Sequence, residues 1–257
     1  MEQYLIWKEL LLSRDPAHPV RWWQEFYVYF YQAFIEGDRW IQYLKGVGTT
    51  LWVTALALII GIILGVVVAI VRTAHDQQRP GNKNFFLGII NAICKVYVTI
   101  IRGTPMMVQL LIMGFVIFSS SRDFTSVGAL TLGINSGAYV AEIIRGGLMS
   151  LDPGQAEAGR SLGLNYIDTM RFIVVPQAFK AILPALGNEF IILLKDTSLI
   201  TVIGGKELVY AAQAIYGRTY EQMFPLVGIA VVYLVLVLIF SYLQSILERR
   251  LRQSDRR

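Results

Sequence analysis

Four polar side chains recur at a fixed spacing in the apolar segment 177–200, where charged groups are costly and need a reason. Asn188 and Lys195 are seven residues apart, and so are Glu189 and Asp196. Seven residues make nearly two helical turns, so the four share one side of a helix. Carboxylates there could face an ammonium group and Lys195 a carboxylate, as binding of a zwitterionic solute requires. The alternative is structural. Lys195 and Asp196 would pair with each other or reach towards the outer membrane interface, and Glu189 would form a hydrogen bond across a helix bundle.

A second apolar segment, 127–148, also carries ionisable groups. Glu142 and Arg145 are about one helical turn apart, which favours an ion pair near one end of the segment. Asn135 and Ser136 lie towards the other end and are further candidates for a polar solute contact.

Motifs for catalysis and metal binding are missing from the sequence. The run Gly204–Lys206 lacks both the first glycine and the Ser or Thr of a phosphate loop. Cys94 is the only cysteine, and His18 and His75 are far apart, so neither a disulfide nor a metal site is expected. We expect a chain that is not an enzyme and binds no cofactor of its own.

Composition places these residues in a membrane. Of the 257 residues 55% are hydrophobic, and the mean hydropathy is +0.53. Both values are too high for an ordinary soluble domain. The net charge of +5 comes from scattered basic residues, which fits membrane-flanking loops better than nucleic acid binding. The sequence predicts an all-α integral membrane protein.

Five segments are long and apolar enough to be predicted as membrane spans. They are 46–71, 104–121, 127–148, 177–200 and 223–247. In the first, Gly61 and Gly65 are one helical turn apart, which permits close contact with another helix.

The segment 85–102 is apolar but has a polar side. Asn91, Lys95 and Arg102 follow one another at spacings of four and seven along one helix face. This pattern favours an amphipathic helix at the cytoplasmic surface, not a crossing.

The ends of the chain differ from its middle, so we expect three regions: 1–45, 46–247 and a basic cytoplasmic tail, 248–257. The first region lacks the pattern of a signal peptide. It is rich in aromatic residues, and the stretch 20–34 suits a helix at the headgroup level of a bilayer. A partly ordered lead-in is an equally good interpretation.

The polar segment between the third and fourth spans has unusually clear local signals. Asp152-Pro153 predicts the start of a helix, and Gly163 fits the left-handed position that ends one. Asn165 with Asp168 three residues later predicts a second start, and Pro176 predicts a break or kink. Two short helices joined by a glycine elbow are expected, and so well specified a loop favours docking on a partner.

This segment resembles the EAA loop of permease subunits of bacterial ABC importers. The similarity is carried by six residues at the family spacing: Glu157, Ala158, Gly159, Gly163, Ile173 and Pro176. Gly159 stands at the family's second alanine and Val175 at its leucine, and both departures are small and apolar. Flanking motifs are similar to those of the polar amino acid subfamily: RGTPMMVQ (102–109), NSGAYVAEIIRGG (135–147) and VVPQAFKAILPALGNEFIILLKDTSL (174–199). The resemblance extends from about Lys45 to the C-terminus.

The resemblance implies a function that composition alone does not. It implies a permease that moves a polar amino acid across the cell membrane and docks the loop, as a coupling helix, on a separate ATPase subunit that binds Mg-ATP. The implied partners are that ATPase, a second permease subunit (identical or related), an extracytoplasmic solute-binding protein and membrane lipid. Two alternatives are a proton-coupled secondary transporter or channel using Glu142 and Glu189, and a membrane scaffold that transports nothing.

Basic residues predict the orientation. With five crossings, fourteen Lys and Arg fall on the side of the EAA-like loop and the tail, including Arg72, Lys95 and Arg102. Eight fall on the other side. The excess of positive charge inside predicts an N-terminus outside the cell and a cytoplasmic C-terminus.

Overall fold

The computed structural model is all-helical over the residues that it describes, which are 2–13, 19–78 and 84–254. The α-helices are α1 (Glu2–Ser13), α2 (Trp22–Phe34), α3 (Arg39–Asp76), α4 (Phe85–Gly103), α5 (Met106–Ile112), α6 (Phe124–Met149), α7 (Pro153–Ser161), α8 (Tyr166–Thr169), α9 (Val175–Asp196), α10 (Leu208–Thr219) and α11 (Met223–Ser254). The 3₁₀ helices are η1 (Glu36–Asp38) and η4 (Thr197–Ile203), and the π-helices are η2 (Met113–Ile117) and η3 (Met170–Val174).

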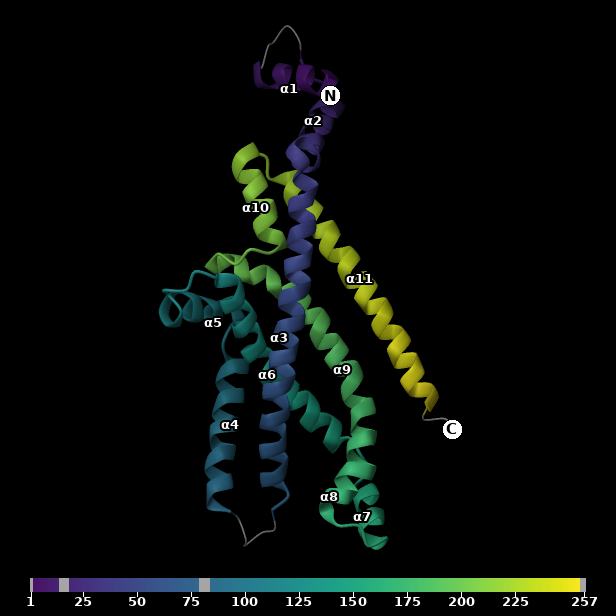
Figure 1. The fold of residues 1–257 in the computed structure, drawn as a ribbon. Helices are drawn as coiled ribbons and strands as arrows, with labels where there is room; N and C mark the ends of the chain where they lie inside the picture. Colours follow the sequence, from purple (N-terminus) through teal and green to yellow (C-terminus); the bar gives the residue numbers. More distant parts are fainter. Residues whose placement is uncertain (1, 14–18, 79–83, 255–257) are drawn as a thin grey trace.

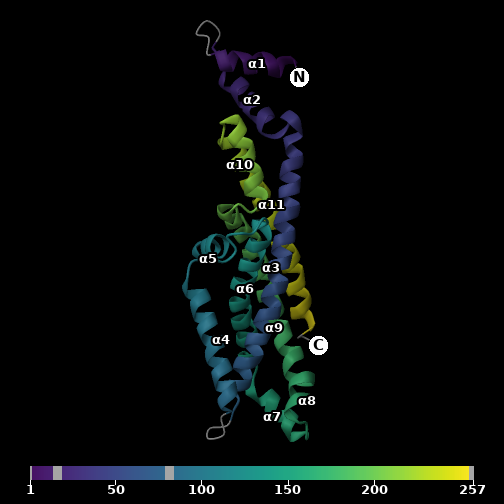
Figure 2. The same ribbon diagram turned by 60° about the vertical axis from the view of Figure 1, so that its left-hand side comes forward.

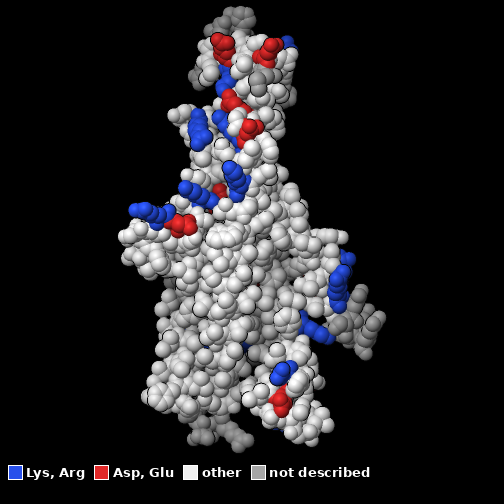
Figure 3. Space-filling view, in the orientation of Figure 1, with Lys and Arg blue, Asp and Glu red and all other residues white. Residues whose placement is uncertain are grey.

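The long helices lie side by side, with α1, α2 and α10 at one end, α7 and α8 at the other, and α5 beside the middle of the bundle (Figures 1 and 2). We call the end with α1, α2 and α10 the α10 end, and the opposite end, with α7 and α8, the α7 end. Charged side chains gather over the α10 end, and fewer lie near α5, near α7 and near the C-terminal part of α11, while most of the remaining surface in this view is free of charge (Figure 3). This distribution is typical of a bundle whose middle lies in lipid.

Five helical segments of the described chain are long and apolar enough to cross a membrane, which confirms the predicted fold class. They are Glu36–Asp76, Phe85–Gly103, Phe124–Met149, Tyr166–Ile203 and Met223–Leu251. Two of them continue well past the predicted ends. The span at Glu36–Asp76 begins ten residues before the predicted 46, and the one at Tyr166–Ile203 begins in the EAA-like loop.

The prediction for α4 was wrong: this helix is one of the five long apolar segments, not a surface helix. Its polar side is only partly covered by protein, since Lys95 is exposed. Asn91 is buried, and Arg102 approaches Glu142 of α6, with 4.0 Å between its Nη1 and the Glu142 Oε2. A polar stripe on a single helix does not reveal whether water or a carboxylate on a neighbouring helix lies opposite it. That ambiguity explains the error.

The predicted span 104–121 was also wrong. Pro105 precedes the first turn of α5, and the helical segment Met106–Ile117 has only 12 residues, ending in the π-helix η2. Twelve residues rise about 18 Å, well short of the roughly 30 Å of a bilayer core. Helix α4 therefore takes the place of the predicted span 104–121, and the number of candidate crossings in the described chain is still five.

Helices α3 and α6 approach closely through glycine. A Cβ on Gly61 would lie 2.7 Å from the Ser136 Oγ, and one on Gly65 would lie 2.5 Å from a methyl carbon of Val140. On the facing helix, a Cβ on Gly133 of α6 would lie 2.7 Å from the side chain of Ile60 of α3. The close contact predicted from the glycine spacing is confirmed, and it places Ser136 in the interior of the bundle.

We expect Gly65→Ala to destabilise the protein by about 1–3 kcal/mol, because the added methyl group overpacks this contact. Gly48→Ala is the matched control, since Gly48 lies in the same helix with nothing within 4 Å of its Cβ position. Both changes raise helix propensity equally. The measurement is the midpoint temperature of unfolding in detergent, and equal midpoints for the two variants would contradict the packing argument.

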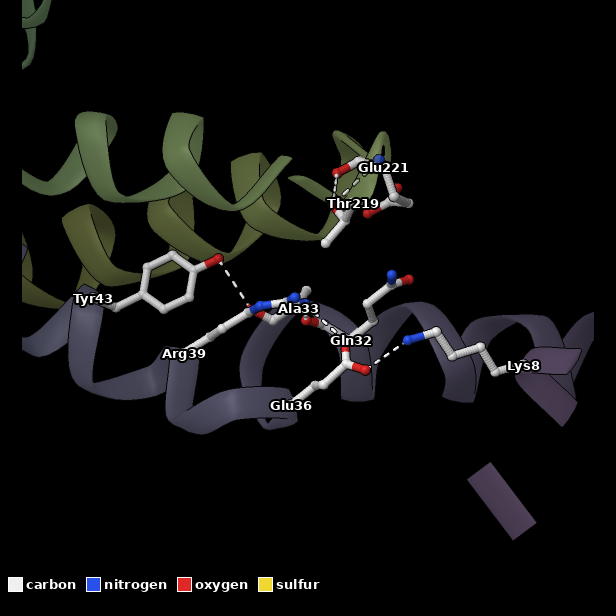
Figure 4. Close-up of polar contacts among 8 residues, drawn as sticks. All are labelled: Lys8, Gln32, Ala33, Glu36, Arg39, Tyr43, Thr219 and Glu221. Carbon is white, nitrogen blue, oxygen red and sulfur yellow. Dashed lines mark hydrogen bonds and ion pairs between the residues drawn. The ribbon is translucent and has the colours of Figure 1, made fainter. Parts of the chain in front are cut away.

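The N-terminal helices form a defined pair at the α10 end, so the partly ordered alternative for residues 20–34 was wrong. Trp7 of α1 packs edge-on against Trp23 of α2, with ring centroids 5.2 Å apart. Lys8 binds Glu36 with an N–O distance of 2.6 Å, and Tyr43 donates a hydrogen bond to a backbone carbonyl at the end of α2 (Figure 4). Placement of this pair at the headgroup level stays a prediction.

Glu207 joins four elements near the α10 end. Its Oε1 accepts hydrogen bonds from the Thr201 hydroxyl (2.6 Å) and the Val209 amide (2.7 Å). Its Oε2 accepts from the hydroxyls of Tyr233 (2.7 Å) and Thr50 (3.3 Å). The side chain is buried and ties α3, η4, α10 and α11 together. Nothing in the sequence singled it out, because two of its partners, Thr50 and Tyr233, are far away along the chain.

We expect Glu207→Ala to destabilise the protein by about 3 kcal/mol or more, because several buried hydroxyl and amide groups lose their acceptor. Glu221→Ala is the control, since Glu221 also caps a helix, accepting from the amides of Met223 and Phe224, but is less buried. Its loss should be about 1 kcal/mol. The midpoint of thermal unfolding measures both, and an equal shift for both carboxylates would refute the role given to Glu207.

The predicted region boundaries fall inside helices. Residue 45 lies in α3 and residue 248 in α11. Part of the basic tail, 255–257, and the basic residues Arg79 and Lys83 lie outside the described residues. Three separate regions therefore stay a prediction.

Candidate coupling loop and solute-path residues

The polar loop at the α7 end has the local structure that its sequence predicts. Asp152 caps α7, accepting a hydrogen bond from the Gly154 amide at 2.8 Å, and Pro153 is the first helical residue. Asn165 caps α8 by accepting from the Asp168 amide at 2.9 Å. Two short helices follow each other as expected.

Gly163 makes the turn between these helices. Its φ is +82°, in the left-handed region that glycine adopts without strain. The Leu164 amide donates to the Gly159 carbonyl at 3.1 Å, and the Gly163 amide donates to the Arg160 carbonyl at 2.9 Å. These two bonds form a Schellman motif, which satisfies the last carbonyls of α7 and fixes the direction of the exit.

The outer surface of the loop carries exposed charged and apolar side chains. The side chain of Glu157 is 71% exposed, and its distance of 4.0 Å from Arg160 makes only a weak ion pair. Leu162 and Ile167 are 80% and 72% exposed, which is unusual for large apolar residues on so polar a loop. The two apolar residues were missed in the sequence, because only a structure shows that they face outwards.

The inner side of the loop is packed. Gly159 is buried, and a Cβ on it would lie 2.9 Å from both Ile173 and Thr169. Gln177 of α9 donates to Gln155 of α7 at 3.0 Å. The loop is therefore in contact with the beginning of the helical segment that contains α9.

Pro176 does not break the helical segment, so the predicted break was wrong, whereas a kink at this position stays a prediction. The helix continues from Tyr166 to Ile203 through the π-helix η3, with Pro176 in the first turn of α9. A proline lacks an amide hydrogen and cannot donate to the carbonyl four residues before it, and the π-helix η3 lies directly before this position. Pro184 is likewise inside α9, and its carbonyl accepts a hydrogen bond from Gln244 of α11 at 3.2 Å.

The predicted polar stripe of α9 divides into two parts. Glu189 is buried and its Oε1 accepts a hydrogen bond from Ser136 of α6 at 2.8 Å. Asn188 and Lys195 are exposed, and Asp196 is half-buried. Lys195 makes no ion pair with a carboxylate in the described part of the chain, so the predicted pairing of Lys195 with Asp196 is not seen.

Asn135 lies one residue before Ser136 and makes a separate contact. Its amide donates to the Gln109 Oε1 of α5 at 3.0 Å, and Gln109 donates to the Ile101 carbonyl of α4 at 2.8 Å. Asn135 thus holds the short helix α5 against the bundle. Its neighbour Ser136 instead contacts Glu189 of α9.

Glu142 lies apart from Glu189, in a cluster of charges between α3, α4 and α6. The ion pair with Arg145 predicted from the sequence is present at 3.5 Å. Glu142 also forms an ion pair with Arg72 and approaches Arg102. The second carboxylate of the cluster is Asp76, whose Oδ2 lies 3.9 Å from the Nη1 of Arg145. The structure therefore favours the structural role of Glu142.

Other chemistry is sparse in the described residues. Among them no group of three or more His, Cys, Asp or Glu is placed to hold a metal ion. Asp123 caps α6, and hydrogen bonds from the Ser126 hydroxyl and the following amides hold the pKa of its carboxyl below the usual value. This cap orients the helix that carries Asn135, Ser136 and Glu142.

Comparison with known proteins agrees with this geometry. Residues 80–253 match the family described as binding-protein-dependent transport system inner membrane component. The chain is 36% identical over 213 residues to the glutamine transport system permease protein GlnP of Escherichia coli (strain K12), covering 81% of this chain and 92% of that one. It is 37% identical over 217 residues to the arginine transport system permease protein ArtQ of Bacillus subtilis (strain 168), covering 82% and 93%.

Solved structures show the same fold. A crystal structure of an amino acid ABC transporter with histidines matches with a TM-score of 0.73 and 41% identity, covering 81% of this chain and 94% of that chain. An inward-facing structure of the MetNI methionine ABC transporter matches with a TM-score of 0.69 over 85% and 99%, and its 19% identity supports the fold alone.

The chain belongs to the family of inner membrane components of binding-protein-dependent transport systems. It is a multi-pass permease subunit of an ABC importer, and such a permease is not the ATPase. Membership implies an ATPase subunit and a solute-binding protein as partners.

Proposed function

We propose that this permease imports a polar amino acid of the glutamine, arginine or histidine class. The observation that carries the proposal is its similarity, over four fifths of its length, to permeases named for glutamine and arginine transport. Glu189 and Lys195 supply one group of each sign, as a zwitterion requires, and Ser136 and Asn188 add polar contacts. Asn188 and Lys195 face away from the chain's own bundle, so a second permease subunit, identical or related, would complete the path.

The loop at the α7 end would transmit the force. Glu157, Leu162 and Ile167 form an exposed surface for the ATPase subunit, which binds and hydrolyses Mg-ATP. The Gln155–Gln177 hydrogen bond links α7 to α9, the helix that carries Glu189. Closure of the ATPase would thus tilt α9 and alternate the access to the solute path.

This proposal places the α7 end in the cytoplasm and the α10 end outside the cell. Because α4 is a membrane-spanning segment, Lys95 and Arg102 no longer count among the basic residues of the cytoplasmic loops. When every Lys and Arg within the five spans is left out in the same way, six remain on each side, so the basic residues no longer decide between the two orientations. The proposed orientation rests on the EAA-like loop as the surface that meets a cytoplasmic ATPase.

Uptake by reconstituted complexes tests the proposal. The permease is reconstituted with its ATPase in vesicles that hold ATP on the ATPase side, and the binding protein is added on the other side. Radiolabelled glutamine, arginine and histidine should accumulate only when all components and ATP are present. Uptake driven by a proton gradient without the ATPase would favour the secondary-transporter alternative, and no uptake of any polar amino acid would favour the scaffold.

A further inference from the structure

The charge cluster around Glu142 lines a cavity that the proposed function does not use. The cavity has a volume of about 330 Å³ and is lined by Arg72, Lys95, Val98, Thr99, Arg102 and Glu142. It lies between α3, α4 and α6, whereas the proposed solute path follows α9.

The cations of this cavity exceed its anions. Arg72, Lys95 and Arg102 face one carboxylate, Glu142, which Arg145 also approaches. Lys95 has no ion pair or hydrogen bond with any residue in the described part of the chain. An uncompensated cation in a membrane-spanning segment costs about 2.5–3.5 kcal/mol on insertion scales. An anion in the cavity would remove that cost.

The surroundings indicate where this anion comes from. On α4, residues next to the cavity-lining positions are apolar and exposed: Val96 is 56% and Ile100 55% exposed. In the membrane such a surface faces acyl chains, so a lipid could place its headgroup among the cations and its tails along α4. Basic cavities between membrane helices are suited to anionic headgroups.

We propose that this cavity binds the phosphate group of an anionic phospholipid. Arg72 is held by Glu142 and positions the cavity wall, while Lys95 and Arg102, both exposed, contact the phosphate oxygens. Thr99, one helical turn from Lys95 on the same side of α4, offers a hydroxyl to the same group. Bound lipid would hold α4, which has few buried residues, against α3 and α6.

The test is the binding of dioleoyl-phosphatidylglycerol to the purified full chain in neutral detergent, followed by native mass spectrometry, with dioleoyl-phosphatidylcholine as the neutral lipid. We expect phosphatidylglycerol to be retained at least about tenfold more strongly than phosphatidylcholine. Lys95→Gln and Arg102→Gln should each weaken that preference several-fold. Arg122→Gln removes one positive charge from an exposed residue outside the spans and should leave the preference unchanged.

Every other result overturns the proposal. Equal retention of the two lipids shows that the cavity is not selective for an anionic lipid. An equal effect of Arg122→Gln shows that only total charge matters. Displacement of the lipid by free inorganic phosphate at millimolar concentration assigns the cavity to a soluble anion instead. Lys95→Gln breaks no contact within the described chain, so it serves if the Arg102 variant fails to fold. Because the assay uses neither the ATPase nor uptake, its failure is distinct from failure of the proposed transport function.

Discussion

Gly163→Val should abolish ATP-driven uptake while leaving a folded permease. A β-branched residue at a φ of +82° is strained by at least about 1–2 kcal/mol, and the chain relieves this by leaving the Schellman turn. The exit from α7 then changes direction and moves Leu162, the residue just before it, away from the surface that we propose for the ATPase. We expect at least a tenfold loss of both ATPase co-purification and uptake.

The same position offers its own control. Asn tolerates the left-handed region far better than Val, so Gly163→Asn should keep most of the activity. Gly163 has nothing within 4 Å of its Cβ position, so neither side chain clashes. If Gly163→Val co-purifies with the ATPase as well as the unchanged protein does, the conformation of this turn is not what docking depends on.

Glu189→Gln should reduce uptake by at least about tenfold, with normal membrane insertion and normal ATPase association. Gln keeps an acceptor for Ser136 and nearly the same shape, so only the charge is lost. A charge-assisted hydrogen bond to a substrate ammonium contributes about 1.5–3 kcal/mol, which corresponds to a tenfold or larger effect. The measurement is the initial rate of amino acid uptake in the reconstituted complex.

Ser136→Ala separates the two roles that Glu189 could have. If Glu189 only stabilises the helix bundle, Ser136→Ala, which removes its hydrogen bond, should lower the rate of uptake more than Glu189→Gln does. If Glu189 binds the solute, the order is reversed. Normal uptake kinetics in Glu189→Gln would make the residue structural.

The loop at the α7 end was predictable because its structure is local. Asp152, Gly163 and Asn165 each satisfy or terminate a helix through hydrogen bonds within a few residues of themselves. The glycine spacing of α3 was also informative, because close helix contact needs small residues wherever the partner lies. These features do not depend on the rest of the fold.

Features that depend on distant partners could not be predicted. The polar side of α4 looked like a water-facing surface because its counter-charge, Glu142, is some forty residues further along the chain. Glu207 seemed unremarkable until the fold brought Thr50 and Tyr233 to it. The stripe of α9 was correctly placed on a helix, but its division between an inner and an outer side depends on where α6 packs.

The most direct test of the account is the accessibility of residue 157 from the two sides of the membrane. Cys94 is replaced by Ala to remove the only native cysteine, and Glu157→Cys introduces a single label site on α7. A membrane-impermeant maleimide should label this site in inside-out vesicles and not in right-side-out cells, and the ATPase subunit should protect it. Labelling from outside the cell, or labelling that the bound ATPase leaves unchanged, would contradict the coupling of this loop to ATP hydrolysis.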